Sequence, residues 1–319
     1  MAVKTAPKTR AGLTKARPVE PGSKVALIAP ASPFDRAEFD AGLAELQRVG
    51  LVPVFDEEIF SREDVVAGPA ERRAAQFLSV LDRDDVDVVM AVRGGYGSME
   101  LLPFLGVEHL RARRTAFVGY SDTTSLHTFL NCYVGITSVH GAMIDGRIAR
   151  GERAYDLRSF LGSLGAEPLG ELTAPGVEVL SPGAAAGPLF GGTLTQIAHS
   201  LGTPYAFAPP PGALLFLEDV GERPYRIRRL LAHLEQADVF RRVEGVIFGE
   251  FVRCDEAGAP GSARSVLAAF ARRMEKPCVF GFPSGHTAGP MISLPFGVAA
   301  RVIADGASPR LILEEAAAG

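Results

Sequence analysis

Three side chains set far apart along the chain have the types that an acyl-transfer reaction needs. Ser121 follows an apolar run at 117–120, Glu218 ends another at 214–217, and His286 lies in a loop rich in Gly and Pro. A serine hydroxyl becomes an effective nucleophile when a histidine takes its proton, and a carboxylate orients that histidine. Ser121 could instead cap a helix, and His286 could be an ordinary surface residue. The chain order Ser, acid, His supports hydrolysis in known folds, so the combination favours a catalytic triad.

Backbone N–H groups near Ser121 could stabilise an oxyanion. Asp122 would begin a helix, and the helix dipole would favour negative charge beside its N–H. The loop Arg93-Gly94-Gly95-Tyr96-Gly97 follows the apolar run at 86–92. Its glycines allow close backbone approach and N–H donation to an oxyanion or carboxylate. The loop lacks the order of a phosphate-binding loop, and a tight turn is its plainer interpretation.

Two acids stand together at the end of an expected strand, Glu218 and Asp219. Strand alternation would turn only one of them towards the serine, and we expect Glu218 to be that one. Asp219 or Glu222 could instead cap the helix that opens near Arg223.

Two other histidines lie in these segments. His140 ends a short apolar strand, and we expect it to line the site. His127 comes six residues after Ser121 on the same expected helix, which is too far along to act as its base.

The elements that must position these residues are typical of an α/β protein. Strands alternate with helices in the first half, which predicts a parallel sheet whose ligands gather at the carboxyl ends of its strands. There we expect strands at 25–30, 51–54, 86–92 and 116–120, and helices at 36–48, 70–82 and 122–132. Further on we expect strands at 213–217, 246–251, 278–281, 298–304 and 310–314, and helices at 193–201, 223–236 and 263–273. The last two strands predict a hairpin.

The chain is predicted to have four parts. Residues 1–22 are rich in Lys, Arg, Ala and Pro and are expected to be a disordered basic tail. Residues 23–145 would form an N-terminal α/β domain that carries the serine, and residues 188–315 a C-terminal domain that carries the acid and the histidine. Between them, residues 146–187 have weak periodicity and predict a linker with one helix near 154–163.

Composition excludes several classes of protein. The 319 residues carry a formal net charge of -4, which argues against a nucleic-acid-binding surface. No stretch of about 18 uninterrupted apolar residues predicts a membrane span, and the basic start lacks the apolar core of a signal peptide. The widely spaced Cys132, Cys254 and Cys278 predict reduced thiols in a cytoplasmic protein, with neither a disulfide framework nor a metal site.

Together these segments resemble the LD-carboxypeptidase family of serine peptidases, which includes the muramoyl-tetrapeptide carboxypeptidases. The resemblance runs from about Val25 to about Leu313. It is carried by Ala91-Val92-Arg93-Gly94-Gly95-Tyr96-Gly97-Ser98, Gly119-Tyr120-Ser121-Asp122, residues 217–227 and Gly285-His286-Thr287. The stretch at 217–227 is the most specific of the four.

The resemblance implies a fold and a set of roles. The fold is an N-terminal flavodoxin-like or amidotransferase-like domain and a smaller C-terminal mixed α/β domain with a β-barrel-like sheet, with the site between them. The implied nucleophile is Ser121, the base His286 and the orienting acid Glu218. The implied oxyanion hole uses backbone N–H groups of Asp122, Gly94 and Gly95.

The resemblance also implies an activity without cofactor or metal. It is the release of terminal D-alanine from a murein tetrapeptide during peptidoglycan recycling, by a homodimer. Activity would fall on the acid side as His286 is protonated, near its ordinary pKa of roughly 6.5. Arg93 is a candidate for the free carboxylate of the substrate. Expected substrate contacts are Arg93, Tyr96, His140 and Thr287.

The chain departs from the family pattern at two positions, so the identity of the substrate stays undecided. Family members often have Asn where this chain has Thr193, and Pro where it has Ala142. A related branch, the microcin-immunity proteins, hydrolyses peptidyl or aminoacyl sulfamoyl-adenylates and stacks the nucleobase on aromatics that include a tryptophan, whereas this chain has no Trp. A non-catalytic module that binds cell-wall peptides is an alternative of another class. Whether the third peptide residue is Lys or diaminopimelate also stays open.

Overall fold

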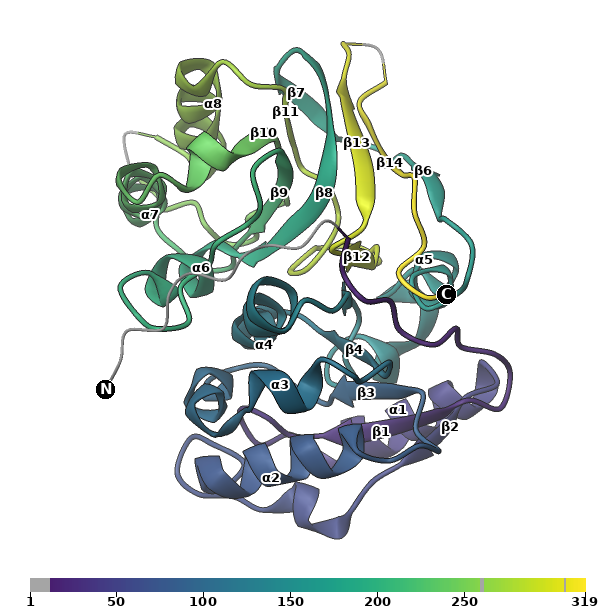
Figure 1. Ribbon diagram of the computed structural model, residues 1–319. Helices are drawn as coiled ribbons and strands as arrows, with labels where there is room; N and C mark the ends of the chain where they lie inside the picture. Colours follow the sequence, from purple (N-terminus) through teal and green to yellow (C-terminus); the bar gives the residue numbers. More distant parts are fainter. Residues whose placement is uncertain (1–11, 259–260, 307) are drawn as a thin grey trace.

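The structure is a computed structural model that describes residues 12–258, 261–306 and 308–319 (Figure 1). One sheet contains, in spatial order, β12 (Leu294–Phe296), β5 (Ser138–His140), β4 (Ala116–Gly119), β3 (Val88–Ala91), β1 (Lys24–Ile28) and β2 (Val52–Val54). The five strands from the N-terminal half are parallel, and β12 joins β5 in antiparallel orientation. Strands β3 and β4 are buried throughout, as expected for parallel strands covered on both faces.

The second sheet is mixed. Its spatial order is β6 (Gly170–Leu172), β14 (Arg310–Leu313), β13 (Ala299–Ala304), β8 (Gly183–Thr193), β9 (Ala213–Glu218), β10 (Val243–Phe248), β11 (Cys278–Phe280) and β7 (Glu178–Ser181). Strands β8 to β11 are parallel, and the outer pairings are antiparallel. Strands β13 and β14 form the predicted hairpin. The α/β fold class is therefore confirmed.

Helices cover both sheets. They are α1 (Arg36–Arg48), α2 (Ala70–Leu81), α3 (Val107–Leu110), α4 (Thr124–Thr128), α5 (Leu157–Gly162), α6 (Leu194–Ser200), α7 (Pro224–Gln236) and α8 (Ala263–Met274). The helix predicted at 122–132 is less regular than expected: a 3-10 turn precedes α4, and a π-helical turn at Phe129–Val134 follows it.

The predicted tail and linker are both partly packed into the fold. Residues 146–187, expected to be a linker with one helix, contain that helix as α5, but they also supply the edge strands β6 and β7 and the start of the inner strand β8 in the second sheet. Of the predicted tail, residues 1–11 lie outside the described residues, but Ala16 is buried and bridges Ala318. Weak periodicity was misleading here, because short edge strands need only a few backbone hydrogen bonds and little apolar surface. The division into domains itself stays a prediction.

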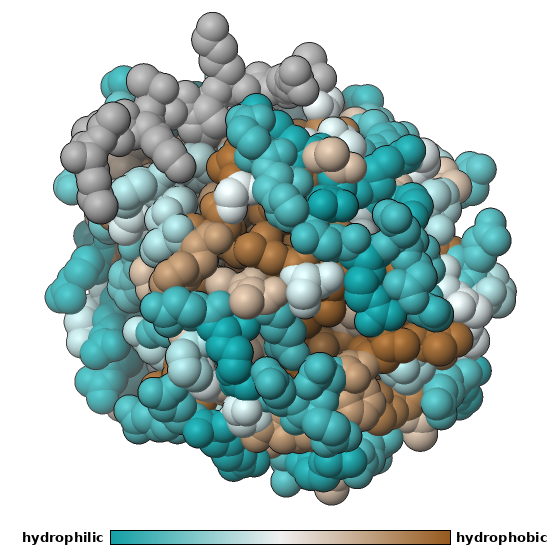
Figure 2. Space-filling model, turned by 60° about the horizontal axis from the view of Figure 1, so that its bottom comes forward, coloured by the Kyte–Doolittle hydropathy of each residue, from teal (hydrophilic) through white to brown (hydrophobic). Residues whose placement is uncertain are grey.

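The surface is mixed in character. Figure 2 shows a face on which hydrophobic residues gather in the middle and hydrophilic residues surround them. Large exposed hydrophobic side chains among the described residues are Val52, Val65, Tyr96, Met99, Phe104 and Tyr225. No helix within the described ranges combines the length and apolar composition needed to cross a bilayer.

Candidate active site

The carboxyl ends of parallel strands from both sheets carry the predicted catalytic residues. Ser121 lies just beyond β4, and Glu218 is the last residue of β9. His286 lies between β11 and β12, on the segment that passes from the second sheet to the first. The ring of Tyr120 packs against that of His286 with 5.2 Å between ring centroids. The residue next to the serine therefore contacts the histidine.

Ser121 occupies a sharp turn between β4 and α4. Its φ is +63°, a left-handed conformation that is uncommon for a residue with a side chain. A Cβ at Gly119 would lie 2.5 Å from the Thr123 hydroxyl, so this turn requires glycine two residues before the serine. Strained backbone of this kind exposes a nucleophile at the end of a strand. The hydroxyl of Thr123 bonds to the Tyr120 carbonyl, and no side chain caps α4.

The glycine loop lies against the serine. A Cβ at Gly94 would be 3.2 Å from Ser121 Oγ and 3.3 Å from the Asp122 backbone nitrogen. A side chain at this position would thus occupy the space where an oxyanion would form. Gly95 has φ +98°, and a Cβ there would lie 2.5 Å from the Ser32 hydroxyl. Neighbouring atoms approach both positions so closely that only glycine fits there. That the N–H groups of these glycines donate hydrogen bonds to an oxyanion stays a prediction.

The side chain of Asp122 anchors this turn rather than pointing into the site. It is 2 % exposed and accepts hydrogen bonds from the Ser98 backbone N–H at 2.8 Å and from Gln196 at 3.3 Å. Burial raises the pKa of Asp122, partly offset by the hydrogen bonds from Ser98.

Glu218 and His286 form a buried pair. Glu218 Oε2 accepts both the His286 ring Nδ1–H at 2.7 Å and the His286 backbone N–H at 2.9 Å. The other carboxylate oxygen accepts the Thr193 hydroxyl. Because Nδ1 donates to the carboxylate, Nε2 keeps its lone pair for a proton from the serine.

The pair shifts both pKa values in opposite directions. Burial raises the pKa of Glu218, but the adjacent His286, with its charge and hydrogen bond, outweighs burial and lowers that pKa to about 2. Burial lowers the pKa of His286, whereas Glu218 raises it, and the net pKa lies above the ordinary value. The expectation of an ordinary histidine pKa was therefore wrong, because the buried carboxylate stabilises the imidazolium.

The backbone around this pair has no room for side chains. Gly285 has φ +75°, and a Cβ there would lie 2.6 Å from Glu218 Cδ. A Cβ at Gly249 would lie 2.6 Å from Glu218 Cβ. No hydrogen bond joins Ser121 to His286 within the part of the chain that the structure describes. Such a bond is often long before substrate binds and shortens as the proton moves.

Asp219 has a different role from the one considered above. Its carboxylate accepts the backbone N–H of Thr195 at 2.9 Å and the Thr195 hydroxyl at 2.7 Å. It therefore caps α6, not the helix that opens near Arg223, which has no side-chain cap. Burial and the neighbouring Glu218 charge raise the pKa of Asp219 to about 6.

The two other histidines lie beneath the site. His127 Nε2 donates to the Gly119 carbonyl at 2.8 Å, and its Nδ1 accepts from Ser138 at 2.8 Å, which fixes the end of β4. Burial lowers the pKa of His127 to about 4 and that of His140 to about 3, so both are neutral at pH 7. His140 is fully buried, and its ring packs between Tyr120 and Phe216.

The expected substrate contacts are dispersed. Arg93 pairs with Asp145 at 3.1 Å, and Tyr96 is 48 % exposed beyond the glycine loop. The Thr287 hydroxyl donates to the Gly289 carbonyl at 2.6 Å. Their roles in binding stay predictions.

Sequence reasoning missed Arg147, which holds the histidine loop. It is 9 % exposed and donates four hydrogen bonds of 3.0–3.1 Å to the main-chain oxygens of Ala154, Gly285, Thr287 and Gly289. The spacing of Arg147, Arg150 and Arg153 was a visible signal, although it lay in the stretch taken for a linker.

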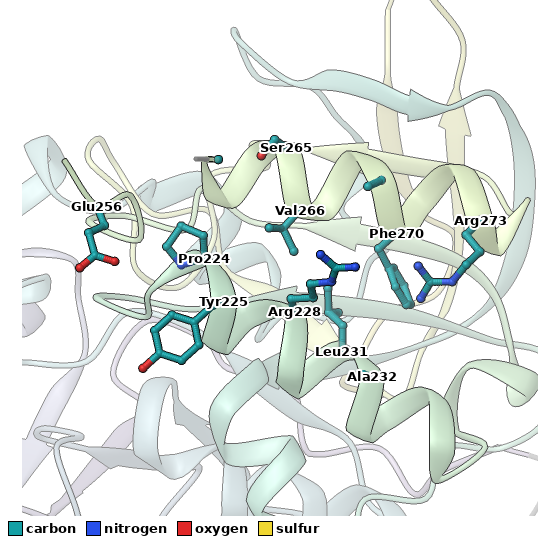
Figure 3. A pocket seen from close by; sticks show the side chains of 12 residues that line it. Pro224, Tyr225, Arg228, Leu231, Ala232, Glu256, Ser265, Val266, Phe270 and Arg273 are labelled. Atoms are coloured by element: carbon teal, nitrogen blue, oxygen red, sulfur yellow. The ribbon is translucent and has the colours of Figure 1, made fainter. Parts of the chain in front are cut away.

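Two hollows are candidates for the substrate-binding site. One of about 650 Å³ lies between α7 and α8, with Tyr225 and Arg228 on one side and Phe270 on the other (Figure 3). None of the predicted catalytic residues lines it. A second, of about 600 Å³, is lined by Tyr120, the three arginines above, Thr287 and neighbouring backbone. Its lining includes the residue before the serine and the residue after the histidine, so this hollow adjoins the candidate site.

Comparison with known proteins identifies the family of this chain. Residues 25–141 match the LD-carboxypeptidase N-terminal domain, and residues 186–302 match the LD-carboxypeptidase C-terminal domain. The chain belongs to the LD-carboxypeptidase family. Within the family, a carboxypeptidase-like protein of Streptomyces coelicolor is 35% identical over 291 residues, covering 89% of this chain and 92% of its own. The murein tetrapeptide carboxypeptidase of Pseudomonas aeruginosa is 30% identical over 278 residues, covering 83% and 88%.

Solved structures share the fold. The muramoyltetrapeptide carboxypeptidase from Oxalobacter formigenes has a TM-score of 0.80 at 27% identity, covering 92% of this chain and 99% of that one. The microcin C7 self-immunity protein in complex with aspartyl sulfamoyl adenosine has a TM-score of 0.87 at 23% identity, covering 96% and 99%. A muramoyltetrapeptide carboxypeptidase and a microcin self-immunity protein therefore share this fold.

Proposed function

We propose that this chain is a serine carboxypeptidase that releases terminal D-alanine from murein tetrapeptides, in peptidoglycan recycling. The observation that supports it most is the buried Glu218–His286 hydrogen bond of 2.7 Å at the edge of a strained Ser121 turn. The proposed substrate class is taken from relatives that are named murein peptide carboxypeptidases. We further propose a homodimer in the cytoplasm.

In this mechanism His286 Nε2 takes the Ser121 proton as Oγ attacks the peptide carbonyl. The tetrahedral oxyanion accepts hydrogen bonds from the backbone N–H groups of Asp122 and the Gly94-Gly95 loop. Glu218 stabilises the imidazolium, which then protonates the leaving D-alanine nitrogen. Water repeats the sequence on the acyl-enzyme, with His286 as its base, and frees the tripeptide.

Mass spectrometry of tetrapeptide digests tests the proposal. Wild type should release D-alanine, and Ser121→Ala should release none while keeping the circular dichroism and melting temperature of wild type. Because Ser121 has a strained backbone, a Ser121→Gly variant provides a second inactive protein without that strain. Substantial turnover by either variant would exclude Ser121 as nucleophile.

A second candidate is hydrolysis of an aminoacyl or peptidyl sulfamoyl-adenylate, favoured by the shared fold with a self-immunity protein that binds such a ligand. Digesting a murein tetrapeptide and an aspartyl sulfamoyl adenosine side by side separates the two, because only the preferred substrate should show high kcat/KM. Binding of the tetrapeptide without cleavage of either compound would instead favour the binding-module alternative.

A further inference from the structure

We propose that the cavity lined by Arg147, Arg150 and Arg153 binds the free carboxylate at the C terminus of the peptide substrate. This inference rests on the proposed function and assigns the part of the site that would make the enzyme a carboxypeptidase. The cavity holds about 600 Å³, within the usual range for small-molecule sites.

The position of the cavity suits this carboxylate. The terminal carboxylate lies one residue beyond the scissile carbonyl, a step of about 3.8 Å between consecutive Cα atoms. Its binding site must therefore adjoin both the nucleophile and the base. Tyr120, which precedes Ser121, and Thr287, which follows His286, both line the cavity.

The charge of the cavity also suits an anion. None of its lining residues is acidic. Arg147 donates its four hydrogen bonds to neutral carbonyl oxygens, and among the described residues no carboxylate pairs with Arg147 or Arg153. Arg150 meets Glu38 only at 3.5 Å. A largely buried guanidinium without a counter-charge is costly, and a substrate carboxylate would stabilise Arg147 by its charge. It would accept charge-assisted hydrogen bonds from the exposed Arg150 and Arg153.

Arg93, the candidate chosen from sequence, is less well placed for this role. Its guanidinium already has a carboxylate partner, Asp145, at 3.1 Å, and it donates to the Pro33 carbonyl at 2.9 Å. A substrate carboxylate would have to compete with Asp145 there. Substituting Arg93 and substituting the cavity arginines should therefore have different effects on binding of the substrate carboxylate.

The experiment measures binding in the Ser121→Ala background by calorimetry, with a murein tetrapeptide and its C-terminal amide as probes. The acid should bind about tenfold more tightly than the amide, as expected for one or two hydrogen bonds to a charged group. Combining Arg150→Gln with Arg153→Gln should remove this preference by weakening only the acid. Both arginines are exposed, so folding should survive. Arg158→Gln, an exposed arginine outside the cavity, is the matched control.

The same double variant with Ser121 intact should raise KM for the tetrapeptide about tenfold and leave kcat nearly unchanged, since ground state and transition state share this contact. The inference is overturned if the preference for the acid persists in the double variant, or if Arg93→Gln abolishes it instead. Failure of the proposed function has a different signature: wild type releases no D-alanine from the tetrapeptide.

Discussion

Replacing Gly285 by Ala should inactivate the enzyme through Glu218 without touching a reacting atom. The added Cβ would lie 2.6 Å from Glu218 Cδ, and ordinary contact begins near 3.4 Å, so the carboxylate must move by about 0.8 Å. Misplacement by about 1 Å typically costs about 10²-fold in rate. Complete loss of the orienting acid costs about 10⁴-fold, which sets the upper limit. We therefore expect kcat to fall between these values.

A matched glycine separates this displacement from backbone strain. Gly285 and Gly221 have φ values of +75° and +70°, but a Cβ at Gly221 has nothing within 4 Å. Each alanine should cost about 1–2 kcal/mol for the left-handed conformation. Both variants should lose this free energy of unfolding in urea, and Gly285→Ala should lose more, because its Cβ also displaces the buried Glu218.

Only Gly285→Ala should lose D-alanine release, measured as kcat by mass spectrometry under saturating tetrapeptide. Activity of Gly285→Ala within threefold of Gly221→Ala would refute the reasoning, because the carboxylate would then not need its present position.

Three further predictions follow from the same pair. The acid limb of kcat/KM should have an apparent pKa above the ordinary histidine value of about 6.5, since Glu218 raises the pKa of His286, and Glu218→Gln should move the limb to lower pH. Because the pKa of Glu218 is lowered to about 2, its contribution to stability is complete above the unfolded value of about 4.3 and is lost as pH falls towards 2, which urea unfolding across this range would detect. Thr193→Val removes a donor to the buried carboxylate and should cost about 1–3 kcal/mol of unfolding free energy, whereas Thr193→Asn, which keeps a donor, should cost less; equal losses would contradict this role.

Several features could be predicted from local sequence because their causes are local. Alternating apolar runs and amphipathic segments are typical of βα units, and they predicted the parallel strands β1, β3 and β4. The break after β4 predicted a turn at Ser121. The motif at 217–227 predicted the family. Contacts that depend on register could not be obtained in this way: Thr193 reaches Glu218 because these residues pair across β8 and β9.

The errors have the same origin. Asp219 was considered as a cap for the helix nearest in sequence, yet its carboxylate accepts the backbone N–H of Thr195 in α6, 24 residues earlier. Residues 146–187 were taken for a linker, although Arg147 within them bonds to carbonyls 138–142 residues away. Neither contact leaves a periodic pattern, because a single polar side chain that meets distant backbone requires no regular spacing.

The sequence by itself determined the family, the α/β class and the chemical types available for catalysis, since these reside in short motifs and in hydrophobic periodicity. Only the tertiary structure decided in which direction burial and pairing move the pKa of His286, that Thr193 binds the other oxygen of Glu218, and that three arginines border the same cavity as the serine and histidine segments. Those properties depend on burial and on distances between residues far apart in the chain, and they arise when the two sheets bring their carboxyl ends together.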